Sequence, residues 1–98
     1  YLMGRTEMYI MSGNYFTERY AYMLATTINQ LSSLCYATYN NKEVSLKSNY
    51  EISHLSEVIP GKRIKITCIN SEYQQALNDL NTVRKLIEHD FTTAIESN

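Results

Sequence analysis

Four short segments of the chain alternate apolar and polar residues, which is the pattern of β-strands with one buried face. The predicted strands are residues 5–12, 34–39, 42–46 and 62–69. In the first, Met8 and Ile10 share one face, and Tyr9 and Met11 share the other. In the last, apolar residues alternate with basic or polar ones: Ile64, Ile66 and Cys68 with Arg63, Lys65 and Thr67.

The two middle strands are predicted to form a tight hairpin. They are joined by Asn40 and Asn41. Asparagine tolerates the positive φ angles that a two-residue hairpin turn requires, although less readily than an Asn-Gly pair. We therefore expect residues 34–39 and 42–46 to pair directly.

Two longer segments carry apolar residues at every third or fourth position, which is the spacing of an amphipathic helix. The first helix is predicted over residues 17–31, with a stripe of Tyr20, Leu24, Ile28 and Leu31. The longest is predicted over residues 72–89, with an inner stripe of Ala76, Leu80, Val83 and Ile87 flanked by Leu77, Arg84 and Leu86. A short helix is expected from Ser48 to about Leu55, so the element order is β-α-β-β-α-β-α.

Two segments match the capping box, a serine followed three residues later by Glu or Gln. In this motif the serine oxygen accepts a backbone N–H of the first helical turn, and the Glu or Gln bonds back to the N–H of the serine. Ser48 and Glu51 form the first predicted box, and Ser71 and Gln74 form the second. Both would mark the start of a helix.

Strands with one apolar face and helices with one apolar stripe predict a two-layer α+β fold. We expect an open-faced β-sandwich, in which three helices cover one face of a four-stranded antiparallel sheet. The predicted core is Ile10, Leu24, Ile28, Ile64, Ile66, Leu80 and Val83. The uncovered face should direct these residues toward solvent: Tyr36, Thr38, Arg63, Lys65 and Thr67. A shift of the strand phase by one residue would instead place Cys35 and Cys68 on the uncovered face.

Length and charge narrow the function classes. Residues 1–98 are enough for one domain with its own core, and residues 92–98, which have no sustained period, are expected to be a frayed tail. The net charge is -1 and the pI is near 6.1, so the chain has no bulk attraction for nucleic acid or anionic lipid. No apolar run approaches the roughly 20 residues of a membrane span, and no signal-peptide pattern is present, so a cytoplasmic location without a membrane partner is expected.

The two cysteines, Cys35 and Cys68, lie far apart in the sequence and without histidines at ligand spacing. Metal binding is therefore not expected, and we predict no cofactor. Both cysteines fall within apolar strand positions, which favours buried thiols of the core over a disulfide or a reactive thiol.

The run Val44-Ser45-Leu46-Lys47-Ser48 after the two-Asn turn, the end segment from Leu86 to Phe91, and the element order together resemble the histidine-containing phosphocarrier protein HPr of the bacterial sugar phosphotransferase system. The resemblance extends from about Met8 to Phe91. HPr proteins carry a phosphoryl group on the histidine of a motif G-[IL]-H-A-R-P-A at the N-terminus of the first helix. Residues 15–21 occupy this place here, and Arg19 and Ala21 match the motif.

Thr17 stands where the motif has its histidine, Glu18 replaces the small residue and Tyr20 replaces the proline. An imidazole forms a labile phosphoramidate, whereas a threonine hydroxyl needs a base and yields a stable ester. We therefore predict that the carrier activity is lost and that Thr17 caps the first helix. Glu18 would place negative charge where a phosphoryl group arrives, and Arg19 would contact an acidic partner or simply face solvent.

Ser48 matches a second functional position, a serine that a dedicated kinase phosphorylates in some HPr proteins to regulate carbon catabolite repression. This resemblance makes Ser48 the candidate regulatory phosphorylation site, although the capping box alone also accounts for a serine there. The family has an apolar pair and a glycine after this serine, whereas this chain has Asn49, Tyr50 and Glu51. The two histidines, His54 and His89, lack the arginine of the motif and are expected to have surface or capping roles.

These observations predict an HPr-like regulatory or protein-binding module rather than an enzyme. The resemblance implies phosphotransferase components or a transcriptional regulator as partners. The candidate partner-binding residues are Thr17, Arg19, Tyr20, Asn49 and Tyr50, with Tyr15 and Phe16 as further exposed aromatics. The alternative is an α+β module that binds single-stranded nucleic acid on its open sheet face through Tyr36, Arg63 and Lys65, which the acidic balance disfavours.

Overall fold

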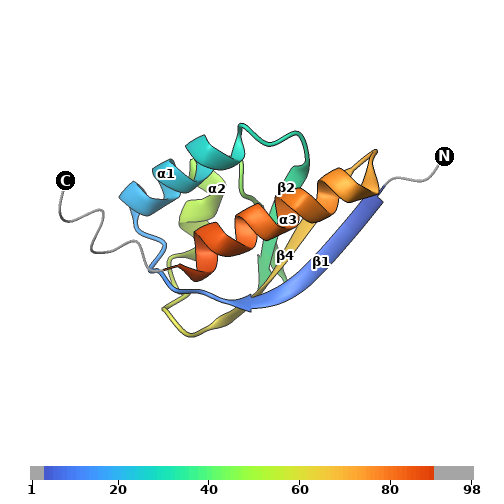
Figure 1. Ribbon diagram of the computed structural model, residues 1–98. Helices are drawn as coiled ribbons and strands as arrows, with labels where there is room; N and C mark the ends of the chain where they lie inside the picture. The colour runs from blue at the N-terminus through green and yellow to red at the C-terminus, as the bar shows by residue number, and fades with distance from the viewer. Residues whose placement is uncertain (1–3, 90–98) are drawn as a thin grey trace.

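The computed structural model describes residues 4–89 (Figure 1), and the predicted tail 92–98 therefore lies outside the described residues, as do Asp90 and Phe91. The strands are β1 Gly4–Met11, β2 Leu34–Tyr39, β3 Lys42–Ser45 and β4 Arg63–Asn70. The α-helices are α1 Glu18–Ile28, α2 Asn49–Ile52 and α3 Tyr73–Glu88, and the 3₁₀ turn η1 Ser53–Leu55 extends α2. The predicted order β-α-β-β-α-β-α is confirmed.

The strands form one antiparallel sheet in the order β1-β4-β2-β3. Figure 1 shows the helices together on one face of this sheet, with α3 lying across β1 and β4. The β2–β3 hairpin turns at Asn40 and Asn41, whose φ angles are 50° and 62°. The architecture is the predicted open-faced β-sandwich.

All seven predicted core residues are buried between the sheet and the helices: Ile10, Leu24, Ile28, Ile64, Ile66, Leu80 and Val83. Cys35 and Cys68 are buried on the same side. The strand phases that the alternation predicted are therefore correct, and the helices of the sandwich rest on the apolar faces of the strands.

One residue of the uncovered face differs from the prediction. Thr67 was expected to face solvent, but it is only 1% exposed. It lies on the central strand β4 with Glu7 and Tyr36 as its cross-strand neighbours, and its hydroxyl lies 3.4 Å from Oε2 of Glu7. Longer side chains on both adjacent strands cover a short one between them, which alternation alone does not reveal.

Two helix boundaries also differ. The helix α1 ends at Ile28 rather than Leu31, because Gln30 and Leu31 donate their N–H groups to Thr27 and Ile28 in a tight terminal turn. The second capping box is wrong. Glu72 is the N-cap of α3 and has no side-chain capping bond, while its N–H donates to Oδ1 of Asn70 at 3.0 Å.

Candidate functional site

The N-terminus of α1 and the helix α2 lie against each other at one corner of the helical layer. They enclose a surface hollow of about 600 Å³. We call it the α1/α2 corner, and its lining residues are Phe16, Thr17, Glu18, Asn49, Tyr50, Ser53 and Ser56. The corner thus brings together the two segments that the sequence singled out, around Thr17 and around Ser48.

Thr17 is the N-cap residue of α1, as predicted. Its Oγ1 accepts the N–H of Tyr20 at 3.1 Å, and its carbonyl accepts the N–H of Ala21 at 2.8 Å. The hydroxyl therefore serves the backbone of its own helix. No histidine lines the corner among residues 4–89, because His54 lies on η1 with its ring against Tyr50, and His89 is the exposed C-cap of α3.

Two charged residues begin α1, and the first of them, Glu18, lines the corner. Glu18 and Arg19 are exposed in the first turn of α1. Arg19 makes no ion pair with any acidic side chain in the described part of the chain. Its guanidinium is consequently available to a carboxylate of another molecule.

Two of the predicted partner-binding aromatics are in the core instead. Tyr20 is 1% exposed and Phe16 is 4% exposed, and their rings meet edge to face at 5.4 Å. The hydroxyl of Tyr20 donates to the carbonyl of Leu86 at 2.9 Å, and burial raises the pKa of Tyr20 well above its usual value. The assignment of Tyr20 to a partner surface is wrong, since the apolar stripe of α1 turns it inward onto α3.

Exposed tyrosines nevertheless flank the corner. Tyr50 is 72% exposed on α2, and Tyr15 is 58% exposed just before α1. Asn49 is also exposed. The sequence reasoning missed Ser53 and Ser56, although their spacing from Asn49, four and seven residues along the chain, is the spacing of one helical face.

Ser48 is the half-buried N-cap of α2, and its Oγ accepts the N–H of Glu51 at 3.2 Å. The reciprocal half of the predicted capping box is wrong. The N–H of Ser48 points to the carbonyl of Ser45, and the carboxylate of Glu51 accepts the N–H of Ser45 at 2.9 Å. Glu51 thus joins the start of α2 to the end of the edge strand β3.

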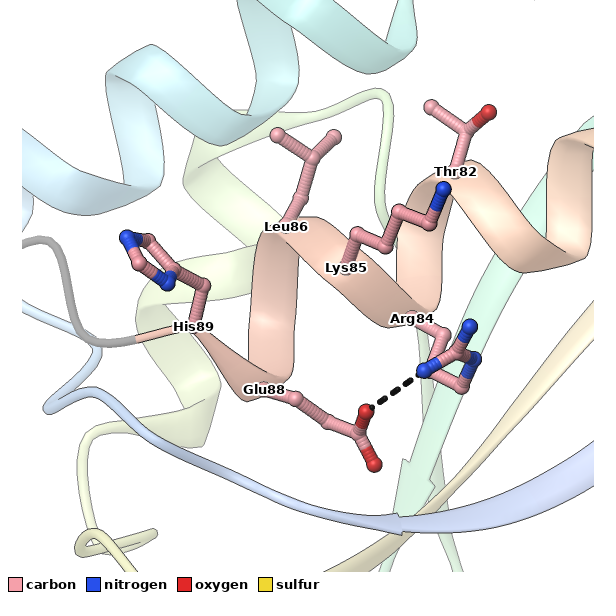
Figure 2. A pocket seen from close by; sticks show the side chains of 6 residues that line it. All are labelled: Thr82, Arg84, Lys85, Leu86, Glu88 and His89. Carbon is pink, nitrogen blue, oxygen red and sulfur yellow. Dashed lines mark hydrogen bonds and ion pairs between the residues drawn. The ribbon is translucent and has the colours of Figure 1, made fainter.

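A second hollow of about 600 Å³ lies beside the last turns of α3. Figure 2 shows its lining side chains, with Arg84 and Glu88 joined by an ion pair of 3.0 Å. Lys85 and His89, the C-cap residue of α3, also line it. The Arg84–Glu88 pair is the exposed i, i+4 contact typical of a solvated helix face.

The open sheet face offers little support for nucleic-acid binding. Tyr36 is half-buried, and the ammonium group of Lys65 lies 3.8 Å from Oε2 of Glu7. The guanidinium of Arg63 lies 5.9 Å from the ring centre of Tyr9. The acidic Glu7 on the edge strand β1, and cations that already interact with neighbouring side chains, both oppose contact with phosphates.

Metal-binding and membrane-spanning features are not found in residues 4–89. No group of three or more His, Cys, Asp or Glu side chains there could hold a metal ion. None of the helices in this part of the chain has both the length and the apolar character that crossing a membrane demands.

Three solved structures share the fold over most of the chain. They are the phosphocarrier protein HPr of Bacillus anthracis, HPr-C-His of Thermoanaerobacter tengcongensis and the histidine-containing phosphocarrier protein of Mycoplasma. The Bacillus anthracis protein is 20% identical with a TM-score of 0.72, and the match covers 85% of this chain and 96% of that one.

The other two matches are similar in extent. The Thermoanaerobacter protein is 21% identical with a TM-score of 0.62, covering 88% and 97% of the two chains. The Mycoplasma protein is 20% identical with a TM-score of 0.66, covering 86% and 100%. The sequence matches no protein-family model and no curated protein. The chain therefore adopts the fold of the HPr phosphocarrier proteins.

Proposed function

We propose that this protein is a regulatory, protein-binding module with the HPr fold that does not carry a phosphoryl group. The observation that supports this most is that Thr17 serves as a helix cap. It occupies the N-cap of α1, where the sequence resemblance puts the carrier histidine, and its hydroxyl is engaged by the N–H of Tyr20.

The chemistry of the α1/α2 corner favours this proposal over residual phosphoryl transfer. A threonine hydroxyl becomes a nucleophile only with a neighbouring general base, and its phosphate ester does not pass readily to an acceptor. The lining carboxylate is Glu18, in the first turn of α1. Its negative charge would repel an incoming phosphoryl group electrostatically.

The same corner has the features of a site for a protein partner. Exposed tyrosines are frequent anchors of protein interfaces, because a rigid ring contributes a large contact area at a small cost in conformational entropy. Tyr50 lines the hollow, and the exposed Tyr15 directly precedes the lining residue Phe16. The exposed Arg19 follows the lining residue Glu18 and has no ion pair within residues 4–89. Phosphotransferase components or a transcriptional regulator, acting with this protein in the cytoplasm, are the proposed partners.

Ser48 is the proposed point of regulation. A kinase would have to displace the N–H of Glu51 from the Ser48 hydroxyl before it could transfer a phosphoryl group. The product would keep oxygen acceptors at the N-cap and add about 1.5–2 negative charges next to Asn49 and Tyr50. Phosphorylation at Ser48 would therefore change the charge of the partner surface.

A titration of the isotope-labelled protein with the purified general phosphotransferase enzyme, followed by NMR, tests the proposal. We expect amide shifts at Thr17, Arg19, Asn49 and Tyr50. Tyr50→Ala should weaken binding by roughly tenfold or more, as truncation of an interface tyrosine does. The matched control is Tyr9→Ala, a tyrosine 66% exposed on the open sheet face.

Equal weakening by Tyr9→Ala and Tyr50→Ala would move the interface away from the α1/α2 corner. Absence of binding to every phosphotransferase component at saturating concentration would leave the fold intact and reject a role in that system. The transcriptional regulator would then be the remaining partner class to titrate.

A further inference from the structure

Cys35 and Cys68 lie side by side in the core. They are direct partners in the register of β2 and β4. Their exposed fractions are 1% and 0%, and their Sγ atoms lie 3.6 Å apart. Two thiols in contact are an arrangement that neither the fold nor the proposed partner surface requires.

The backbone brings the two residues close enough for a covalent bond. The carbonyl of Cys35 accepts the N–H of Leu46, just past β3, at 2.9 Å. The N–H and C=O of one residue in an extended strand point to the same side, so Cys35 directs its backbone groups toward β3 and forms a non-hydrogen-bonded pair with Cys68. The Cα atoms of such pairs lie about 4.5 Å apart, within the range of about 4.4–6.8 Å that disulfides bridge.

We propose that Cys35 and Cys68 form a site of reversible covalent modification, an intramolecular disulfide that a small peroxide produces. The thiolate of Cys35 attacks one peroxide oxygen, the O–O bond breaks, and a sulfenic acid and one water form. The sulfur of Cys68 then attacks the Cys35 sulfur, the S–O bond breaks, and the sulfenic oxygen leaves with the proton of the Cys68 thiol as a second water. Two thiols and one hydrogen peroxide thus become one disulfide and two waters.

The surroundings of the two sulfurs give them different roles. The hydrogen bond from the Cys68 thiol lowers the pKa of Cys35, and this contact together with burial raises the pKa of Cys68. The first attack therefore belongs to Cys35, because the thiolate is the nucleophile. Burial of both residues favours a small neutral oxidant over a bulky disulfide such as oxidised glutathione.

The bond would enclose the whole segment between β2 and β4. This segment contains β3, α2 and η1, and with them the candidate residues Ser48, Asn49 and Tyr50. A covalent loop of this kind reduces the freedom of the unfolded chain, so the oxidised protein should melt at a higher temperature than the reduced one.

The test is oxidation of the native full-length chain with hydrogen peroxide, removal of the excess with catalase, and alkylation under denaturing conditions. We expect a mass lower by two hydrogen atoms, no alkylated cysteine, and a cross-link between the tryptic peptides 20–42 and 66–84. Dithiothreitol should restore both alkylation sites and lower the melting temperature to its original value.

Three outcomes would overturn the proposal: both cysteines remaining alkylatable, gain of oxygen atoms without a cross-link, or disulfide-linked dimers. The matched control is Cys35→Ala, in which peroxide should produce neither the cross-link nor the rise in melting temperature. If the melting temperature still rises on oxidation of Cys35→Ala, the rise comes from another oxidised residue. If this variant does not fold, reversal by dithiothreitol in the native chain decides between the same outcomes.

Discussion

Replacing Ser48 by alanine isolates the contribution of the cap at α2. The change removes the Oγ that accepts the N–H of Glu51 at 3.2 Å, and it leaves in place the bond from Ser45 to the Glu51 carboxylate. Loss of an N-cap acceptor costs about 1 kcal/mol. For a domain of this size, that loss lowers the melting temperature by about 4–8 °C. Ser48→Asp keeps an acceptor at the same place and should leave the free energy of unfolding within about 0.5 kcal/mol.

Urea unfolding of these two variants, measured beside Ser56→Ala, is the appropriate assay. Ser56 is exposed in the same segment, and its hydroxyl makes no hydrogen bond within residues 4–89, so its loss should change the free energy of unfolding by less than about 0.5 kcal/mol. If Ser48→Ala proves no more destabilising than Ser56→Ala, the cap does not account for the serine. A regulatory reason for Ser48 would then gain support.

Two further substitutions test the packing around the site. Tyr20→Phe should cost about 1 kcal/mol through loss of the bond to Leu86. Burial raises the pKa of Tyr20 above the unfolded-state pKa of about 10, so the neutral phenol stabilises the folded state fully below about pH 10. This stabilisation is lost as the pH rises above about 10. The phenylalanine variant should therefore lose less stability than the native chain in alkaline unfolding curves. A variant whose alkaline curve parallels that of the native chain would contradict this. Asp79→Ala should cost about 3 kcal/mol in a urea melt, because the carboxylate accepts the N–H and hydroxyl of the fully buried Ser33; a loss below about 1 kcal/mol would mean that water replaces those bonds.

The main elements of the fold could be predicted from the sequence because each strand and helix carries its own period. The alternation in β4 places Ile64 and Ile66 inside, and the spacing in α1 places Leu24 and Ile28 there. The positive φ angles at Asn40–Asn41 also follow from local chemistry. These features depend on neighbours along the chain, which the sequence displays directly.

The wrong predictions concern residues whose hydrogen bonds or burial depend on contacts with other parts of the fold. The N–H of Ser48 points to the Ser45 carbonyl, and the Glu51 carboxylate accepts the N–H of Ser45 instead. The capping-box motif does not predict either bond. Thr67 is buried by side chains on both adjacent strands. Tyr20 belongs to the apolar stripe of α1, so its position in the stripe was a better guide than its place in the motif.

The contact between Cys35 and Cys68 lay beyond prediction for a similar reason. Their burial followed from the alternation, but their direct pairing depends on β4 lying between β1 and β2. The order of strands in a sheet is a property of the whole fold. A sequence that predicts four strands does not by itself tell which of them are neighbours.

The most direct test of the proposed loss of carrier activity is incubation of the protein with phosphoenolpyruvate, labelled in its phosphate, and the general phosphotransferase enzyme. The HPr protein of Bacillus anthracis serves as the positive control in the same reaction. We expect no label on this protein, because Thr17 stands at the N-cap and no histidine lines the α1/α2 corner within residues 4–89. An acid-labile phosphoryl group on any residue, His54 and His89 included, would contradict the account.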